Sequence, residues 1–300
     1  MEWYWLLFLL PSLLVNIFDS FGWRALLLSM GRKVPLTALV IVHVGSEAIA
    51  RSIPLGVPLA DSARSLLLKR DHAIPLTEGA FGSLLRRLSL GTTQCILLSV
   101  AIVIGYSDIS KIFSGLKVEG VSTNRLILCI IATAVVTFGV IFVLRKQEVF
   151  IRRFRFIRPL RARLRSTVLA LQTRTPEQRL NVFKVLSFYL ALWSSEVVET
   201  YVLLNALGFN SSIENALSIE AGVSLVRLVA FFLPSGIGVQ ETGYAGIIGA
   251  LGLTGASHIG IFLVAKRLRD VVWISLGFVI LLWKGVTPSR KGISLELTKI

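Results

Sequence analysis

Long apolar runs, separated by short polar or basic segments, make up most of this 300-residue chain. A helix needs about 20 consecutive apolar residues to cross the hydrocarbon core of a bilayer. Several runs reach that length, so the pattern predicts an all-α integral membrane protein, a polytopic helical bundle in which residues 1–300 form a single membrane domain. The predicted spans are residues 3–28, 81–106, 125–144, 183–207 and 257–283.

Two further apolar regions are interrupted by helix-breaking residues. Residues 36–53 are followed by a break and a short arm over residues 60–70, and residues 216–233 by a break and a returning arm over residues 239–252. Proline removes a backbone donor and clashes with the preceding turn, whereas glycine leaves the backbone flexible. The pattern predicts two re-entrant helix hairpins with hinges at Pro54, Gly56, Pro58, Pro234, Gly236 and Gly238.

One stretch of the chain is duplicated. Residues 54–87 reappear without a gap, 180 positions later, as residues 234–267. Because helix breakers, acids and bases recur together in apolar sequence, we expect an internal repeat, with repeat one at about residues 1–106 and repeat two at about residues 183–284. The matched positions include Pro54 and Pro234, Gly56 and Gly236, Asp61 and Glu241, Arg86 and Lys266, and Arg87 and Arg267.

Basic residues are concentrated in one central segment. Residues 145–184 hold twelve Lys or Arg against two acids, and their pattern suits an amphipathic helix on anionic headgroups. The excess of bases predicts a cytoplasmic position for this segment and for the tail, residues 285–300, in a multi-pass protein of the cell (inner) membrane. With the segment inside, the other basic loops also fall inside, and the two repeats run in opposite directions through the bilayer. The sequence therefore predicts inverted-topology repeats joined by span 125–144 and the cytoplasmic segment 145–182.

Composition narrows the class of protein further. Hydrophobic residues make up 54% of the chain, mean hydropathy is +0.75, and the net charge of +15 comes mainly from segments that flank apolar spans. Such charge sets topology and meets anionic lipid, so no nucleic-acid partner is expected. The chain has no zinc-type Cys/His cluster, no phosphate-binding P-loop and no nucleophile elbow, and its three histidines, His43, His72 and His258, are isolated in the sequence. We expect no cofactor, no metal and no enzymatic activity.

Many charged residues fall inside the apolar regions, where an ionised side chain costs about 2.5–3.5 kcal/mol on insertion scales. Such residues must pair inside the bundle, lie near an interface, or line a polar cavity, and arginine suits phosphate because it binds bidentately. The bland alternative is that they are structural ion pairs. The candidate substrate-binding residues are Arg64, Arg86, Arg87, Arg227, Lys266, Arg267 and Arg269, and the candidate charge partners or proton sites are Glu47, Asp61, Glu196, Glu199, Glu241 and Asp270.

These features resemble the flippase-like membrane domain of lysylphosphatidylglycerol synthases and its stand-alone relatives, which include a hopanoid-associated group. The strongest match is Leu233-Pro-Ser-Gly-Ile-Gly-Val-Gln-Glu241, followed by a glycine-rich arm and by Arg267 and Arg269. Glu196 before Ala206-Leu-Gly208 also follows the family pattern, whereas Ala60 and Asp61 replace a Gly-Glu pair in the first half. The resemblance implies translocation of lipid or lipid-linked substrates. No aminoacyl-transferase domain is expected in this chain, so synthase activity is not carried over.

The sequence thus predicts a lipid flippase that moves a lipid with a charged, phosphate-bearing headgroup between leaflets, with membrane lipids as its partners. Two alternatives stay open: a proton- or ion-coupled transporter of a soluble anion, and a non-catalytic membrane subunit that recruits a lipid-modifying enzyme. A membrane enzyme acting on a lipid phosphate is disfavoured because the chain offers no convincing catalytic constellation. The sequence does not specify the lipid, the direction of transport, the energy source or the oligomeric state.

Overall fold

The computed structural model describes residues 9–54, 56–115, 139, 181–229, 237–253 and 256–285. These residues are helical with short connections and contain no strand, which confirms the all-α expectation for the part of the chain described. The expected span 125–144, apart from Gly139, and the basic segment up to residue 180 lie outside the described residues, as do Pro234, Gly236 and the tail beyond residue 285. The helices are α1 (Leu9–Ser29), α2 (Leu36–Ser52), α3 (Gly56–His72), α4 (Leu76–Ile104), α5 (Tyr106–Gly115), α10 (Val182–Ala206), α11 (Ile213–Val229), α12 (Val239–Ala250) and α13 (Ala256–Trp283).

Two boundaries differ from the expected ones. Helix α4 begins at Leu76, earlier than residue 81, because it starts directly after Pro75, whose φ of −56° is already close to a helical value. Helix α5 occupies the start of the region expected to be a polar loop, residues 107–124. Its polar side chains hide the helix from a hydropathy reading, but Ile109 and Ile112 recur at helical spacing and are buried.

The first break lies where the sequence places it. Helix α2 ends at Ser52, Pro54 is in a turn, and α3 begins at Gly56. A Cβ at Gly56 would lie 2.6 Å from the carbonyl oxygens of both Ile49 and Ala50, so the chain reverses through a contact that only glycine permits. Pro58 then falls in the first turn of α3, where a missing N–H is tolerated.

The second break is closed by an acid. Gly238 precedes α12 with a φ of +85°, a left-handed conformation that favours glycine. The Glu241 carboxylate accepts a hydrogen bond from the Gly238 N–H at 2.8 Å and so satisfies one of the free donors at the start of α12. Glu241 also pairs with Arg267 of α13, which ties the returning arm to the next helix.

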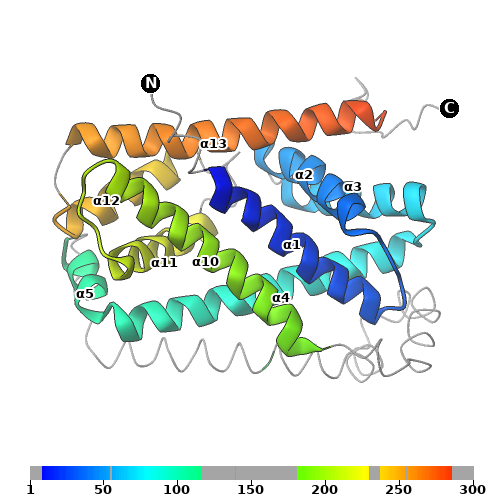
Figure 1. The fold of residues 1–300 in the computed structure, drawn as a ribbon, viewed down its shortest axis with the longest axis horizontal. Helices are drawn as coiled ribbons and strands as arrows, with labels where there is room; N and C mark the ends of the chain where they lie inside the picture. Colours follow the sequence, from blue (N-terminus) through cyan, green and yellow to red (C-terminus); the bar gives the residue numbers. More distant parts are fainter. Residues whose placement is uncertain are drawn as a thin grey trace.

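The described helices form two matching halves, α1–α4 (the first half) and α10–α13 (the second half). Helix α1 crosses α10, and the Phe21 and Phe188 rings stack there at 5.3 Å between centroids. Helix α2 packs on α3 of its own half and on α13 of the other, and α11 packs on α12 and on α4 in the same way. In Figure 1 the α2–α3 pair lies toward one end of the long axis and the α11–α12 pair toward the other.

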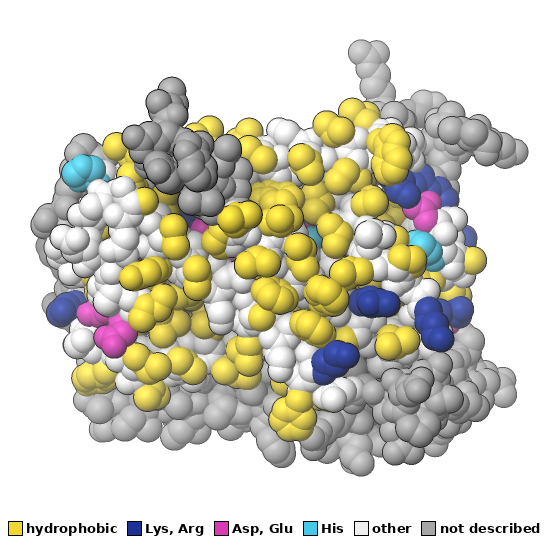
Figure 2. All heavy atoms as spheres, in the orientation of Figure 1, with side chains coloured by type: hydrophobic (Ala, Val, Ile, Leu, Met, Phe, Trp, Pro, Cys, Tyr) yellow, Lys and Arg dark blue, Asp and Glu magenta, His cyan; other side chains and the backbone are white. Residues whose placement is uncertain are grey.

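Apolar side chains both fill and cover this bundle. One buried cluster surrounds Trp23 of α1 and Tyr189 of α10, and a second surrounds Ile219, Ile247 and Phe262 in the second half. Figure 2 shows hydrophobic side chains across the middle of one face and charged side chains mainly toward the two ends of the long axis. Among the described helices, α4 is the one long and apolar enough to cross a membrane by length and composition, with a mean hydropathy of 1.7 over its test window.

Candidate functional site

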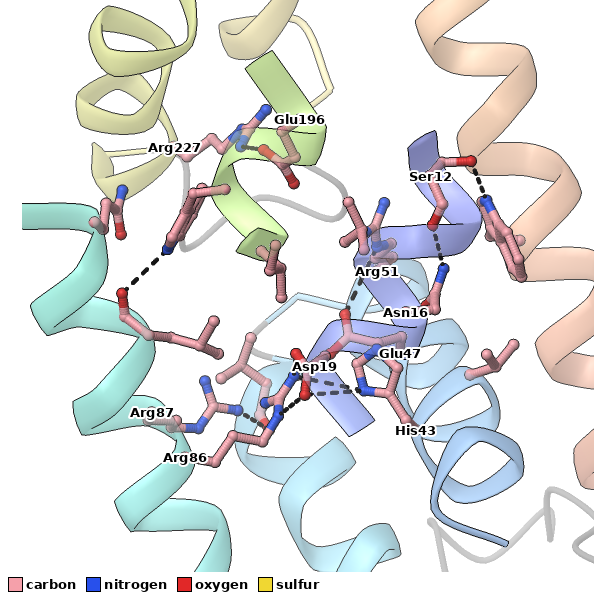
Figure 3. Close-up of a pocket in the computed structure, with 18 of the residues that line it drawn as sticks. Ser12, Asn16, Asp19, His43, Glu47, Arg51, Arg86, Arg87, Glu196 and Arg227 are labelled. Atoms are coloured by element: carbon pink, nitrogen blue, oxygen red, sulfur yellow. Dashed lines mark hydrogen bonds and ion pairs between the residues drawn. The ribbon is translucent and has the colours of Figure 1, made fainter. Parts of the chain in front are cut away.

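A cavity of about 510 Å³ lies between the two halves. Its walls come from α1, α2, α4 and the start of α3 in the first half, and from α10, α11 and α13 in the second. Figure 3 shows Arg227 and Glu196 on one side of it and Asp19, His43 and Glu47 on the other. The charged lining comprises three acids, Asp19, Glu47 and Glu196, against five arginines, Arg51, Arg86, Arg87, Arg227 and Arg269, so these acids and arginines together give the wall a net positive charge.

A buried ion pair joins α4 to α1 at the floor of the cavity. Arg86 donates to both oxygens of Asp19, from Nε at 2.6 Å and from Nη2 at 2.5 Å, and each side chain is only 4% exposed. His43 of α2 is equally buried, with its Nδ1 3.8 Å from Asp19 Oδ1 and 3.5 Å from Arg86 Nη2. This cluster holds three helices together and leaves its charges at the cavity surface.

A second cluster ties the first hairpin to α4. Arg64, 1% exposed, donates to Glu47 at 2.5 Å and to Asp61 at 2.8 Å. Arg87 pairs with the other oxygen of Asp61 and donates to the Val57 carbonyl at 3.1 Å. Asp61 is therefore shared between two guanidinium groups, and this arrangement fixes α3 against α2 and α4 close to the break.

The second half holds a denser buried network. Lys266 of α13 contacts Glu199 at 2.9 Å, Glu220 at 3.2 Å and the Thr200 hydroxyl at 2.8 Å. Arg269 donates to Glu199 at 2.5 Å. These acids and Lys266 are at most 6% exposed, so each charge needs its partners to remain in the interior.

Arg227 connects this network to the cavity. It donates to Glu196 at 2.8 Å, to Glu220 at 3.1 Å and to the Tyr244 hydroxyl at 3.0 Å. The Tyr244 hydroxyl in turn donates to Glu220 at 2.8 Å. Arg227 is 24% exposed, the most accessible member of this group toward the cavity side.

The ion pairs of the two halves correspond at the same spacing of 180 residues. Arg87 pairs with Asp61 as Arg267 pairs with Glu241, in each case linking a hairpin arm to the next helix of the chain. Arg86 pairs with Asp19 of α1, and Lys266 pairs with Glu199 of α10. The duplicated residues are therefore duplicated contacts, not merely similar letters.

A family described as "Lysylphosphatidylglycerol synthase TM region" matches residues 1–277. This chain belongs to that family. The chain is therefore a membrane protein, and its family is linked to lipid synthesis or transport. No curated protein and no solved structure matches it.

In this member of the synthase transmembrane-region family, the residues expected at the site fall into three groups. The cavity itself is lined by Glu47, Arg86, Arg87, Glu196, Arg227 and Arg269. Arg64, Asp61, Glu199 and Lys266 lie behind that wall in the ion pairs described above. Arg267, Glu241 and Asp270 border a separate hollow of about 20 Å³ together with Lys266, Arg227 and Arg269.

Several wall residues of the transmembrane region are not predicted by the sequence pattern. Asp19 lies in an ordinary apolar helix, but continuing the 180-residue spacing back from Glu199 reaches it. His43 has no charged neighbour in the sequence, and only the packing of α2 on α1 and α4 brings it to Asp19 and Arg86. Trp193 and Trp273 line the cavity from α10 and α13, and no local pattern distinguishes them from interfacial tryptophans.

At the end of the bundle near the first hairpin, Arg32 lies in the connection between α1 and α2. It donates to Glu78 of α4 at 2.7 Å from Nε and at 3.1 Å from Nη2. This bidentate hydrogen bond to Glu78 raises the pKa of Arg32 above its usual value. The pair fastens the loop to the start of α4, away from the residues that line the cavity.

Proposed function

We propose that this protein moves a lipid with an anionic, phosphate-bearing headgroup between the leaflets of the bilayer. The observation that carries the proposal is the cavity between the two halves, whose five arginines outnumber its three acids. Guanidinium groups bind phosphate oxygens bidentately and lose less on partial dehydration than an ammonium does. A cavity of about 510 Å³ also falls within the ordinary size range of ligand sites.

The paired state of the arginines gives the site a way to bind and release its ligand. Arg87 is held by Asp61 and Arg227 by Glu196 and Glu220, so a phosphate entering the cavity replaces carboxylate oxygens as a guanidinium ligand. When the phosphate leaves, the ion pairs re-form and no charge is left alone in the interior. Exchange of this kind keeps the barrier to movement low in both directions.

We further propose that the two halves are inverted-topology repeats, each with a re-entrant hairpin. Three observations support this: the ion pairs recur at a spacing of 180 residues, α2 packs on α13 as α11 packs on α4, and the two hairpins lie toward opposite ends of the bundle. In such proteins the substrate site lies at the repeat interface and the breaks act as hinges. Gly56 and Gly238, with Pro54 and Pro58, are the described residues of those hinges, and Pro234 and Gly236 complete the second one.

The orientation rests on the positive-inside rule. The basic segment 145–184 and the tail are placed in the cytoplasm of a cell with the protein in its inner membrane. Lys33, Lys69, Arg70, Lys184 and Lys284 belong to the same side in this arrangement. No catalytic residue is assigned, and a partner lipid-modifying enzyme is the alternative if lipid movement is absent.

The test is lipid translocation in proteoliposomes with fluorescent phosphatidylglycerol, an aminoacylated phosphatidylglycerol and a polyprenyl phosphate, each read by quenching of the outer-leaflet label. Arg227→Gln is expected to slow movement of the transported lipid about tenfold or more, because a guanidinium contact to phosphate is lost. Arg24→Gln is the matched control, since Arg24 is exposed on α1 and does not line the cavity. Both variants are first checked for an unchanged thermal unfolding profile in detergent.

Movement of none of these lipids by the wild-type protein would contradict the proposal. Uptake of radiolabelled inorganic phosphate in the same vesicles would then favour a soluble-anion transporter. Co-purification of a stoichiometric enzyme would favour a recruiting subunit.

A further inference from the structure

The two halves meet along two seams beside the cavity, one between α4 and α10 and the other between α1 and α13. These seams correspond to each other, because α4 matches α13 and α10 matches α1. Each is bridged at the cavity wall by a hydrogen bond from an indole to a hydroxyl. Trp193 Nε1 donates to Thr93 Oγ1 at 3.1 Å, and Trp273 Nε1 donates to Ser12 Oγ at 3.0 Å.

The seams differ in what surrounds that bond. Helices α4 and α10 pack along one another, and the buried cluster Leu97, Val197 and Ala216, with Trp193 against it, fills the space between them. Nothing wider than side-chain rearrangement passes through a seam packed in this way.

The other seam is not packed along its length. Helix α13 lies on α2 instead of α1, so closely that a Cβ at Gly277 would be 2.6 Å from the Val44 carbonyl oxygen and from the Ala48 Cβ. Because α13 is committed to α2, the Trp273–Ser12 hydrogen bond bridges a seam that α13 and α1 do not otherwise close by extended packing. One hydrogen bond contributes only about 0.5–1.5 kcal/mol net, so it is a weak latch.

The lining of the cavity changes character toward this second seam. Its wall there consists of Ser12, Val15 and Asn16 from α1 and of Trp273 and Ile274 from α13, all uncharged. The charged groups of the wall lie on the same and neighbouring helices further in, from Asp19 to Arg86 and Arg227 (Figure 3). The cavity is therefore amphipathic, with a charged interior and an uncharged margin at α1 and α13.

The outer faces of both helices beside this margin are apolar and exposed. Helix α1 presents Leu10, Leu13 and Leu14, and α13 presents Leu268, Val271, Val272 and Leu276. In a membrane protein such exposed apolar faces contact acyl chains. The uncharged margin of the cavity is thus continuous with surfaces that face the hydrocarbon of the bilayer.

We propose that the α1–α13 seam is a lateral portal through which the hydrocarbon tails of the transported lipid remain in the bilayer while its headgroup occupies the charged cavity. Trp273 closes the portal by its bond to Ser12 and opens it by releasing that hydroxyl. This inference rests on the proposed function and narrows it, because it assigns the substrate to the class of membrane lipids with hydrocarbon tails, as opposed to small soluble anions. The headgroup needs the arginines, and the tails need the seam.

Cross-linking the seam tests the portal. In a background with Cys95→Ser and Cys129→Ser, the double variant Ser12→Cys/Trp273→Cys is joined by a cleavable bis-maleimide and assayed with fluorescent phosphatidylglycerol in phosphatidylcholine vesicles. Cross-linking is expected to slow translocation about tenfold or more, and cleavage of the linker is expected to restore it. Recovery after cleavage shows that the protein had remained folded.

The matched control joins two elements of the same half. Arg32→Cys/Glu78→Cys cross-links the α1–α2 connection to α4, and neither residue lines the cavity. Translocation is expected to be unaffected by that cross-link. Unchanged translocation in the cross-linked Ser12/Trp273 variant, with active wild-type protein, would overturn the portal and leave the flippase proposal standing. A wild-type protein that moves no lipid would overturn both.

Discussion

Glu47 and Arg227 occupy corresponding positions of the two halves, 180 residues apart, and both line the cavity with opposite charges (Figure 3). Glu47 is held by Arg64 at 2.5 Å, and Arg227 by Glu196 at 2.8 Å. The two halves therefore match in their helices and in their inner ion pairs but differ in the charge they present to a ligand. A headgroup that carries both a phosphate and an ammonium has a partner on each half.

The first prediction concerns this pair. Glu47→Gln is expected to slow translocation of an aminoacylated phosphatidylglycerol more than that of phosphatidylglycerol itself, because the carboxylate is the acidic wall group available to an ammonium on α2. The ratio of the two initial rates in proteoliposomes measures the effect, and a change of about tenfold corresponds to about 1.4 kcal/mol. An equal loss for both lipids would show that Glu47 acts only by holding Arg64 and α3.

The second prediction separates structural from ligand-facing acids. Glu199 is fully buried and bonded to Lys266 and Arg269, whereas Glu196 is 15% exposed and bonded to Arg227. Glu199→Gln leaves two buried cations short of a counter-charge and is expected to lower the free energy of unfolding by about 3–5 kcal/mol. Glu196→Gln is expected to cost less, because water in the cavity compensates Arg227. Thermal unfolding in detergent compares the two, and equal losses would refute the distinction.

The third prediction concerns the first hinge. Gly56→Ala places a Cβ 2.6 Å from two backbone oxygens, which cannot rotate away, and is expected to lower the free energy of unfolding by about 1–3 kcal/mol. Gly91→Ala is the matched control in α4, because a Cβ there meets nothing within 4 Å, and it is expected to be neutral or to stabilise by up to about 1 kcal/mol. A neutral Gly56→Ala variant would mean that the reversal does not depend on close approach of the backbone.

The fourth prediction is a pH dependence at the open end of the first hairpin. Asp71 accepts from Arg70 at 2.7 Å and from Lys284 at 2.8 Å, which links α3 to the end of α13. Burial opposes ionisation of Asp71, but the hydrogen bonds and charges of Arg70 and Lys284 outweigh it and hold its pKa below the usual 3.8.

Because the folded-state pKa of Asp71 is depressed, its contribution to stability is present above the unfolded value and is lost as the pH falls through the folded value. The difference in unfolding free energy between wild type and Asp71→Asn is expected to be about 1 kcal/mol or less near neutral pH and to vanish in strong acid. Unfolding profiles of both proteins across that pH range test this. A difference that persists at low pH would assign the link to packing and not to charge.

The sequence alone determined the class of fold and the existence of the duplicated ion-pair residues. Apolar run length specifies membrane helices, and the spacing of Pro54, Gly56, Asp61 and Arg87 specified where the first helix breaks and which charges lie beyond the break, because these effects are local to a few turns. The helical start at Leu76 and helix α5 were placed less well, since Pro75 and the polar face of α5 obscure the hydropathy pattern.

Only the tertiary structure decided which charges face the cavity and which are buried behind it. Arg86 and Arg87 are neighbours in sequence, but one is 4% and the other 35% exposed, because successive residues on a helix point in different directions. Asp19, His43, Ser12 and Trp273 became site residues through the packing of α1, α2, α4 and α13, which brings together positions as far apart as residues 12 and 273. Contacts of that range depend on the whole bundle, and no local pattern encodes them.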